Sequence, residues 1–364
     1  MPVGLWLGES AIAGLGNDDA ATVAATQAFG DWLAERGLDP FTFNGFPQGN
    51  FHQEIVKHDV YRPTWAQEQR LRYTEKLAVV QSMLLERAGA APSLQTISTL
   101  PLGWPEVAKQ SLFEQGQAFL RQCAENLSSL ATFLNRLKQD SGNHVMVCIE
   151  PEPGCVLDTG ADIVRFFGEY LLRGDSSQAD IVRDHIGICH DVCHSAVMFE
   201  DQETAVAAYK EAGLRIGKVQ VSSAIRVDFD DSASRQTKLD QLFKFAEPRY
   251  LHQTSIRNEG EISFYEDLTE ALKAETDPAG QWRVHFHVPI FEETLGEIET
   301  TQSEIVAFVA AAKKHAVEVP HFEVETYAWN VLPEEHRNLA GGLAQGIAEE
   351  MLWFGSLDPD NAPK

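Results

Sequence analysis

Eight short apolar runs recur along the chain, and most are followed by a longer segment rich in helix-forming residues. The runs span residues 3–8, 41–47, 96–103, 144–153, 186–194, 217–224, 282–291 and 320–329, and helices are expected at 65–89, 106–139 and 300–316. Apolar strands that alternate with helices indicate a parallel sheet. Eight such units in 364 residues predict an α/β fold of the (β/α)8 TIM-barrel type.

A doubly wound open sheet is the alternative architecture. It would normally carry a glycine-rich phosphate loop after its first strand, and "GLGNDD" at 14–19 does not fit that pattern. The barrel is therefore the preferred prediction.

One connection, residues 225–281, is longer than a single crossover helix requires. Within it, "YLHQTSIRNEGEISFYEDL" (250–268) predicts two short strands about a turn at Asn258, Glu259 and Gly260. We expect an inserted hairpin segment between strands six and seven, above the barrel mouth. Residues 1–355 are expected to form one domain, and residues 356–364 a frayed tail.

The charge balance excludes one class of ligand. With 54 acidic and 29 basic residues the formal net charge is −25, and the sequence has no cluster of Lys and Arg that would neutralise phosphates. We therefore expect a small-molecule ligand and no nucleic acid. No run of 18 apolar residues and no secretory signal is recognisable, and five cysteines without a CxxC pair suit a reducing compartment, so a cytoplasmic protein is expected.

Polar residues gather where the predicted strands end, which is where barrel enzymes carry their chemistry. Taken in chain order, these residues are Glu150, Asp191, His194, Gln220, His285, His287 and Glu325. Carboxylates with imidazoles are the usual ligands of Mn²⁺, Zn²⁺, Co²⁺ or Fe²⁺. Because several acids inside a barrel need a cation, the pattern predicts a divalent metal.

Each of these residues also has a plain structural interpretation. A single strand histidine is more often a core residue than a ligand, and His190 and His321 are assigned to that class. Glu152 could be solvated, and Glu323 could point inward lower in the barrel. His285 and His287 share one face of their strand. Since they should differ in depth, His287 is predicted nearer the mouth and the better ligand.

The strand-end residues Glu150, Asp191 with His194, and Glu325 resemble those of the xylose-isomerase-like barrel superfamily, which includes sugar isomerases and epimerases and endonuclease IV. In that superfamily a Glu, an Asp-x-x-His, a His and a final Glu hold the metal. The resemblance leaves Gln220 or the His285 and His287 pair for the remaining position. It also suggests His52, in "NGFPQGNFHQ", as an early-loop histidine of the endonuclease IV branch.

More closely, the chain is similar to EboE-type metabolite traffic proteins. The similarity is carried by "FTFNGFPQGNFH", "IEPEPGC", "HDVCH", "HFHVPIF" and "EVETYAWNVLP". It implies a barrel encoded beside a prenyltransferase-like membrane protein, a possible partner, and beside a sugar-phosphate-cyclase-like enzyme. The implied context is the biosynthesis or export of a secondary metabolite.

The leading hypothesis is a divalent-metal-dependent isomerase or epimerase acting on a sugar- or cyclitol-like polyol. Glu150 and Glu325 would bind the ion and exchange the proton, and His194 and His287 would complete the coordination. His252 and Arg257 are predicted to bind substrate, and Arg257 or Arg283 would contact a phosphate.

The alternative is a metal-dependent phosphate-ester hydrolase of endonuclease IV type, with further ions held by His52, His252 and the His285 and His287 pair. A non-catalytic carrier of a metabolite is the third hypothesis, because a fold does not determine a function.

Overall fold

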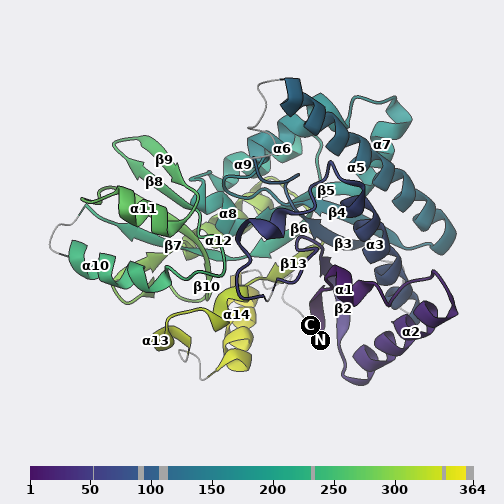
Figure 1. Cartoon of the computed structure of the whole chain (residues 1–364), viewed down its shortest axis with the longest axis horizontal. Helices are drawn as coiled ribbons and strands as arrows, with labels where there is room; N and C mark the ends of the chain where they lie inside the picture. The colour runs from purple at the N-terminus through teal and green to yellow at the C-terminus, as the bar shows by residue number, and fades with distance from the viewer. Residues whose placement is uncertain (52, 89–93, 106–113, 231–233, 338–341, 358–364) are drawn as a thin grey trace.

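The computed structural model describes residues 1–51, 53–88, 94–105, 114–230, 234–337 and 342–357 (Figure 1). A seven-stranded sheet, paired parallel throughout, forms a nearly closed barrel in the order β1-β2-β3-β4-β5-β6-β13. Its strands are β1 (Pro2–Trp6), β2 (Asp39–Asn44), β3 (Leu94–Thr99), β4 (His144–Ile149), β5 (Ile186–Asp191), β6 (Ile216–Val221) and β13 (His321–Val324). The prediction of an α/β barrel is thus confirmed.

Helices lie on the outside of the barrel (Figure 1). They include α2 (Ala20–Glu35), α3 (Glu68–Ala88), α5 (Glu114–Ser141), α6 (Gly160–Phe166), α7 (Ser176–His185), α9 (Gln202–Glu211) and α12 (Gln302–Lys314). Short elements at the mouth include η1 (Lys57–Tyr61), α8 (Val192–Val197) and η4 (Tyr327–Asn330). Helix α14 (Leu343–Leu357) takes the first two residues of the predicted tail, and the rest of that tail lies outside the described residues, as do 106–113 of the helix expected at 106–139.

The barrel strand expected at 282–291 belongs to a second sheet instead. There β10 (Gln281–Val288) pairs antiparallel with β7 (Ser223–Asp228) and with β8 (Thr254–Asn258). Only Ser222 separates β7 from barrel strand β6, so the chain passes directly from one sheet into the other. Because β10 pairs with β7 and β8, it does not join the barrel sheet. In the described residues that sheet has seven strands, and the prediction of eight was wrong.

The second sheet lies beside the barrel and has the order β11-β12-β7-β10-β8-β9 (Figure 1). Its remaining strands are β9 (Glu261–Tyr265), β11 (Thr294–Leu295) and β12 (Ile298–Thr300), with α10 (Arg235–Leu242) and α11 (Leu268–Ala274) in its connections. Strands β8 and β9 form a hairpin in which Glu259 and Gly260 have φ of 49° and 86°, as a type I′ turn requires. The hairpin is therefore the outer edge of a sheet that contains β10, and not a separate addition to an eight-stranded barrel.

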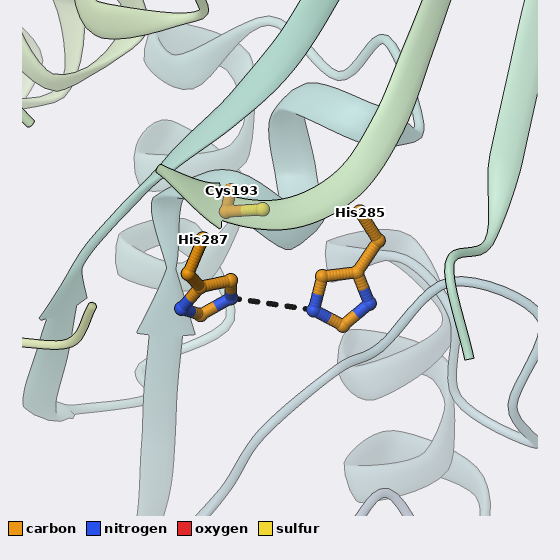
Figure 2. Close-up of side chains that lie close together, drawn as sticks. All are labelled: Cys193, His285 and His287. Carbon is orange, nitrogen blue, oxygen red and sulfur yellow. Dashed lines mark hydrogen bonds between the residues drawn. The ribbon is translucent and has the colours of Figure 1, made fainter. Parts of the chain in front are cut away.

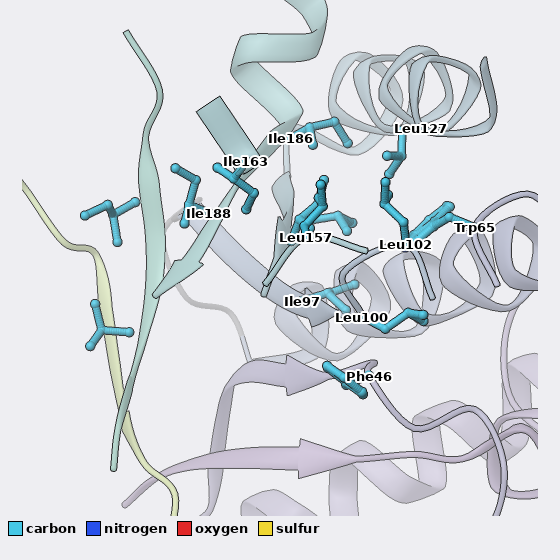
Figure 3. Packing of buried hydrophobic residues seen from close by; sticks show 14 of the residues in the cluster. Phe46, Trp65, Ile97, Leu100, Leu102, Leu127, Leu157, Ile163, Ile186 and Ile188 are labelled. Carbon is cyan, nitrogen blue, oxygen red and sulfur yellow. The ribbon is translucent and has the colours of Figure 1, made fainter. Parts of the chain in front are cut away.

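The buried apolar residues form two main clusters. One joins the barrel strands to the outer helices, with Trp65, Ile97, Leu127 and Ile188 among its members (Figure 3). The other lies against the second sheet, and β10 supplies it with Trp282, Val284, Phe286 and Val288. Because successive strand residues point to opposite faces, this packing directs Arg283, His285 and His287 to the other side.

The barrel sheet ends at β1 and β13. The side chain of Glu323 on β13 reaches Gly4 on β1, and its Oε1 lies 1.5 Å from the place that a Cβ of Gly4 would take. The absence of a side chain at Gly4 thus lets the two edge strands approach. In the described part of the chain, no helix is both long enough and apolar enough to cross a membrane.

Candidate metal centre

The carboxyl ends of the barrel strands meet β10 at one buried site. Asp191 ends β5 and caps α8, because its Oδ1 accepts a hydrogen bond from the backbone N–H of His194 at 2.9 Å. This cap brings both side chains of the Asp-x-x-His motif to the same side. Glu150 and Glu325 follow β4 and β13 directly, and the free face of β10 brings His285 and His287.

Three imidazole nitrogens converge at this site. The Nε2 of His285 lies 3.2 Å from the Nε2 of His194 and 3.3 Å from the Nε2 of His287. Figure 2 shows the rings of His285 and His287 turned toward each other. The sequence-based expectation that these two histidines lie at different depths was wrong. The pairing of β10 with β7 is irregular between Val284 and Val288, so the strand is not regularly paired where it carries them.

The other ring nitrogen of each histidine fixes its tautomer. His194 Nδ1 donates to the Pro151 carbonyl at 2.8 Å, and His287 Nδ1 donates to the Glu325 carbonyl at 2.7 Å. His285 Nδ1 lies 2.7 Å from the side-chain oxygen of Gln253. Since a neutral imidazole carries one proton, all three Nε2 atoms present lone pairs to one another.

Three lone pairs facing one another are unfavourable unless a cation or proton lies between them. Burial lowers the pKa of His194 to about 4, and burial together with the neighbouring imidazoles holds the pKa of His285 well below its usual value. Protonation therefore does not resolve the contact near neutral pH, and the arrangement is a candidate site for a metal ion.

Buried carboxylates complete the site. Asp191 Oδ2 lies 3.9 Å from His194 Nε2 and 3.8 Å from His287 Nε2, and it has no hydrogen-bond partner among the described residues. Burial alone would raise the pKa of Asp191, but the two imidazoles and the bonds to its Oδ1 hold that pKa below its usual value. Asp191 is thus the carboxylate that stays charged.

The pKa values of Glu150 and Glu325 shift in the opposite direction to that of Asp191. Burial, reinforced by the charge of Asp191 in both cases, raises the pKa of each well above the usual range. Oxygens of Glu150, Asp191 and Glu325 lie within 4.8 Å of one another. Glu150 Oε2 has no partner among the described residues, whereas Glu325 Oε1 accepts a hydrogen bond from Asn44 Nδ2 at 2.9 Å.

The donor set fits a divalent transition ion. Tetrahedral bonds of about 2.0–2.1 Å to nitrogen place ligand nitrogens roughly 3.3 Å apart, and the measured Nε2 separations are 3.2 and 3.3 Å. Each ligand imidazole also has the hydrogen-bonded Nδ1 that is usual at metal sites. Cys193 lies close to His285 and His287, but burial raises the pKa of its thiol well above the usual value (Figure 2).

The structure thus brings together six of the residues singled out in the sequence, namely Glu150, Asp191, His194, His285, His287 and Glu325. Gln220 lies next to Asp191 in the strand register and is fully buried, but it does not line the pocket and its amide has no partner among the described residues. His52 lies outside the described residues.

The two predicted substrate-binding residues lie away from the pocket. His252 uses both ring nitrogens, one with the carbonyl of His285 at 2.9 Å and one with Glu247 Oε1 at 2.9 Å. Arg257 is exposed and its guanidinium lies 4.4 Å from the centre of the Phe199 ring. Arg283 is likewise engaged, with the Ala196 carbonyl and with Glu304.

The sequence allowed Glu152 to be solvated, but in the structure it is only 6% exposed and lines the pocket. Its Oε1 accepts hydrogen bonds from Tyr61 Oη at 2.8 Å and Gln253 Nε2 at 3.1 Å. Burial raises the pKa of Glu152 to about 7. The "EPEP" repeat of Glu150 and Glu152 is a local signal for this residue, whereas Tyr61 and Gln253 have none in the sequence.

Five of the six residues, Glu150, His194, His285, His287 and Glu325, line one pocket, whereas Asp191 is not among its lining residues. Its wall is largely aromatic and includes Trp6, Phe51, Tyr250 and Tyr327, whose rings contact one another with centroids 4.8 to 6.4 Å apart. Lys57 is the one Lys or Arg among the described lining residues, and its Nζ lies 2.7 Å from Asp267 Oδ2. The pocket therefore combines apolar walls with an acidic, imidazole-rich floor.

Glu323 does not belong to this pocket. Its Oε2 forms an ion pair of 2.5 Å with Nζ of Lys218, a fully buried residue of β6. The two therefore neutralise each other inside the barrel.

No protein-family model matches the chain, and no curated protein is similar enough to be matched. Several solved structures are similar in fold. A D-tagatose 3-epimerase-like protein has a TM-score of 0.45 and 9% identity, over 99% of this chain and 89% of that one.

Two further solved structures are similar to this chain in fold. A xylose isomerase-like TIM barrel protein from Mycobacterium smegmatis, in complex with magnesium, has a TM-score of 0.46 and 12% identity, over 93% of this chain and 79% of that one. The IolI protein with a bound zinc atom has a TM-score of 0.43 and 12% identity, over 94% of this chain and 82% of that one.

Proposed function

We propose that this protein is a divalent-metal-dependent isomerase or epimerase that acts on a sugar- or cyclitol-like polyol. The observation that carries the proposal is the convergence of three imidazole lone pairs and three buried carboxylates at one site, five of whose six residues line a single pocket. His194, His285, His287 and Asp191 would hold the ion. Because three of these ligands are imidazoles, Zn²⁺, Co²⁺ or Fe²⁺ is favoured over Mg²⁺, with Mn²⁺ between them.

Glu150 and Glu325 are proposed to exchange the substrate proton. The bound ion would polarise a substrate oxygen and acidify the adjacent C–H. The two glutamates follow β4 and β13, with β5 and β6 between those strands, so they approach the site from different directions. Glu150 Oε2 is free to take a proton from the substrate carbon, and Glu325 Oε2 would return it. Their raised pKa values suit groups that alternate between acid and base.

The pocket favours a neutral substrate. The aromatic rings of Trp6, Phe51 and Tyr327 offer flat faces on which the C–H groups of a sugar or cyclitol ring can pack. A phosphate would need basic partners, and the single lining cation that is described, Lys57, is paired with Asp267. A phosphate group would also lie close to Glu152 and Glu325. We therefore infer that the substrate is not phosphorylated.

Solvent isotope exchange tests the reaction. Metal-loaded protein in ²H₂O should place deuterium on one carbon of a substrate drawn from a panel of free sugars and cyclitols, read by NMR. Glu150→Gln and Glu325→Gln should each abolish net conversion of that substrate, whereas Glu318→Gln, at an exposed carboxylate, should not. If the metal-loaded protein exchanges no hydrogen across the panel, the isomerase proposal loses its support.

A second candidate function is favoured by one observation. The candidate ligand atoms fall into overlapping groups, among them Asp191 with His194 and His287, and Asp191 with Glu150 and Glu325. Two ions sharing Asp191 would suit hydrolysis of a phosphate ester. Elemental analysis decides between the two functions, because two or more ions per chain with cleavage of bis(p-nitrophenyl) phosphate favours hydrolysis. Ligand binding without turnover of either kind would indicate a carrier.

The biological context is proposed from the sequence resemblance to EboE-type metabolite traffic proteins. In this view the cytoplasmic protein hands its product to a membrane prenyltransferase-like partner during biosynthesis or export of a secondary metabolite. Affinity purification of the tagged protein, co-expressed with that neighbour and extracted in detergent, tests the partnership. Recovery of the neighbour at the level of an untagged control would contradict it.

A further inference from the structure

We propose that Gln253 is a positioning residue that fixes the proton of His285 on Nδ1 and so makes His285 the third imidazole ligand. Its functional meaning rests on the proposed metal site. The proton position itself is a property of the metal-free protein, and it follows from a chain of hydrogen bonds that begins at Tyr61 and Glu152.

The direction of each bond follows from Glu152 Oε1, an oxygen that accepts two hydrogen bonds. It accepts from Tyr61 Oη at 2.8 Å, so the single phenol proton is used there. Tyr61 Oη then has only lone pairs to offer Gln253 Nε2, which lies 3.0 Å away and must donate. The same amide nitrogen also donates to Glu152 Oε1 at 3.1 Å. Both amide protons of Gln253 are thereby accounted for.

The other end of the amide determines the state of His285. With the nitrogen of Gln253 turned to Tyr61 and Glu152, its Oε1 faces His285 Nδ1 at 2.7 Å. An amide oxygen can only accept, so Nδ1 must carry the proton. The reverse orientation of the amide would set its oxygen against the oxygens of Tyr61 and Glu152.

Water has little access to these bonds. Tyr61 is 1% exposed, Glu152 6%, Gln253 0% and His285 4%. In so buried a network each donor depends on its protein partner, because an unmade bond there is costly. The orientation of Gln253 is therefore held firmly.

His285 differs in this respect from the other two imidazoles of the site. His194 and His287 donate to backbone carbonyls, of Pro151 and Glu325, which no substitution removes. The proton of His285 depends on a side chain, so it is the one whose position a single substitution can change. Gln253 belongs to the segment between α10 and β8 and lines no part of the described pocket wall.

The experiment uses full-length, metal-free protein labelled with ¹⁵N-histidine. Two-bond ¹H–¹⁵N correlations report which ring nitrogen of each histidine is protonated, and His285→Gln identifies the signals of that ring. We expect Nδ1–H on His285 in the wild type. Gln253→Met, which keeps length and removes all hydrogen bonding, should convert His285 wholly or partly to Nε2–H. Gln253→Glu, which keeps an acceptor, should restore Nδ1–H.

Metal affinity is the second measurement. Loss of a hydrogen-bonding partner of a ligand typically weakens metal binding by about 10- to 100-fold, so Gln253→Met should weaken Co²⁺ binding by that factor in a visible-absorption titration. A matched control is Gln81→Met, because Gln81 is also 0% exposed and donates to the carbonyl of Thr96, away from this site. It should change neither the proton position nor the affinity.

Two outcomes overturn the inference. One is a wild-type His285 protonated on Nε2, and the other is a folded Gln253→Met protein with unchanged proton position and unchanged Co²⁺ affinity. If the wild type shows Nδ1–H but binds no Co²⁺, the metal-dependent function fails while the role of Gln253 in positioning the proton stands.

Discussion

The Nε2 atoms of His194 and His285 lie 3.2 Å apart, although one residue belongs to helix α8 and the other to strand β10. Each ring donates from Nδ1 to an oxygen, so each presents a lone pair to the other. Folding thus assembles acceptors that only a cation can satisfy together. Binding of an ion should add directly to the stability of the fold.

Metal loading should therefore raise the melting temperature. At a free concentration of about 1,000 times Kd, an ion bound only by the folded state adds about 4 kcal/mol to the free energy of unfolding. For a chain of 364 residues that is a rise of roughly five degrees. Differential scanning calorimetry of chelator-treated protein, with and without Zn²⁺ or Co²⁺, checks the expectation. Equal melting temperatures would show that the cluster binds neither ion.

Asp191→Asn should remove the ion without removing the helix cap. Asparagine keeps an Oδ1 that can accept from the His194 N–H and from Ser222, whose bonds to Asp191 are 2.9 and 2.7 Å long. It lacks the charged Oδ2 that faces the imidazoles. We expect metal content to fall at least tenfold by elemental analysis, with the free energy of unfolding of the metal-free protein changed by less than about 1 kcal/mol. Full occupancy in this variant would refute the assignment of Asp191 as a ligand.

Removing one partner of the buried ion pair inside the barrel should destabilise the fold. Lys218→Met leaves Glu323 facing its neighbours without a cation, and such losses typically cost about 3–5 kcal/mol. Glu323 keeps 12% side-chain exposure, so a value near the lower end is expected. Lys218→Met combined with Glu323→Gln should recover most of the loss. Urea unfolding measures both, and equal stabilities of the single and double variants would contradict this account.

Stability should depend on pH through Glu200, which lies away from the metal centre. Burial raises the pKa of Glu200 to about 7, although its Oε1 accepts a hydrogen bond from Gly160 N–H at 2.9 Å. The protonated form is thus favoured by folding. Its stabilising contribution is fully present below the unfolded pKa of about 4.5 and is lost as pH rises through about 7.

Glu200→Gln removes this titration while keeping an oxygen for Gly160. Relative to wild type, the variant should gain about 3 kcal/mol between pH 4.5 and pH 8, as measured by urea unfolding at each pH. Asp158, whose pKa burial raises to about 7, titrates in the same range, and the charge of Glu200 adds to that rise, so the difference between the two proteins includes the coupling of Glu200 to Asp158. A difference that does not change with pH would contradict the prediction.

The strand-end chemistry could be predicted from local patterns. A carboxylate at the end of a parallel barrel strand points to the mouth, which places Glu150, and the i, i+3 spacing of Asp191 and His194 turns both side chains to one side once Asp191 caps the helix. These constraints act within a few residues. The positions of these side chains could therefore be predicted from the sequence. That they bind an ion stays a prediction.

The place of β10 could not be predicted in the same way. Both of its faces are buried, one by Val284 and Phe286 in the second apolar cluster and one by His285 and His287 at the metal centre. A strand buried on both sides has the same pattern in either sheet. Which sheet β10 joins is decided by its pairing with β7 across the long connection, and that pairing is a tertiary contact.

The hydrogen-bond network behind His285 could not be predicted from the sequence, for a related reason. Tyr61 comes from η1, Glu152 from the loop after β4 and Gln253 from the loop before β8. No spacing in the chain links them. Of the neighbours His252 and Gln253, only the histidine has a side chain that indicates a function by its type. The amide of Gln253 acquires a role only from its partners.

The division of the centre between two sheets also has a consequence for the order in which the protein is made. Glu150, Asp191 and His194 leave the ribosome with the barrel strands, whereas His285 and His287 follow only after β7, β8 and β9. Glu325 comes last, directly after β13, so both the second sheet and the closing barrel strand must be made before the centre is complete. A nascent chain that ends before residue 285 carries two of the three carboxylates and a single imidazole of the set, a combination suited to hard ions, and the preference for softer ions arises only when β10 joins the second sheet.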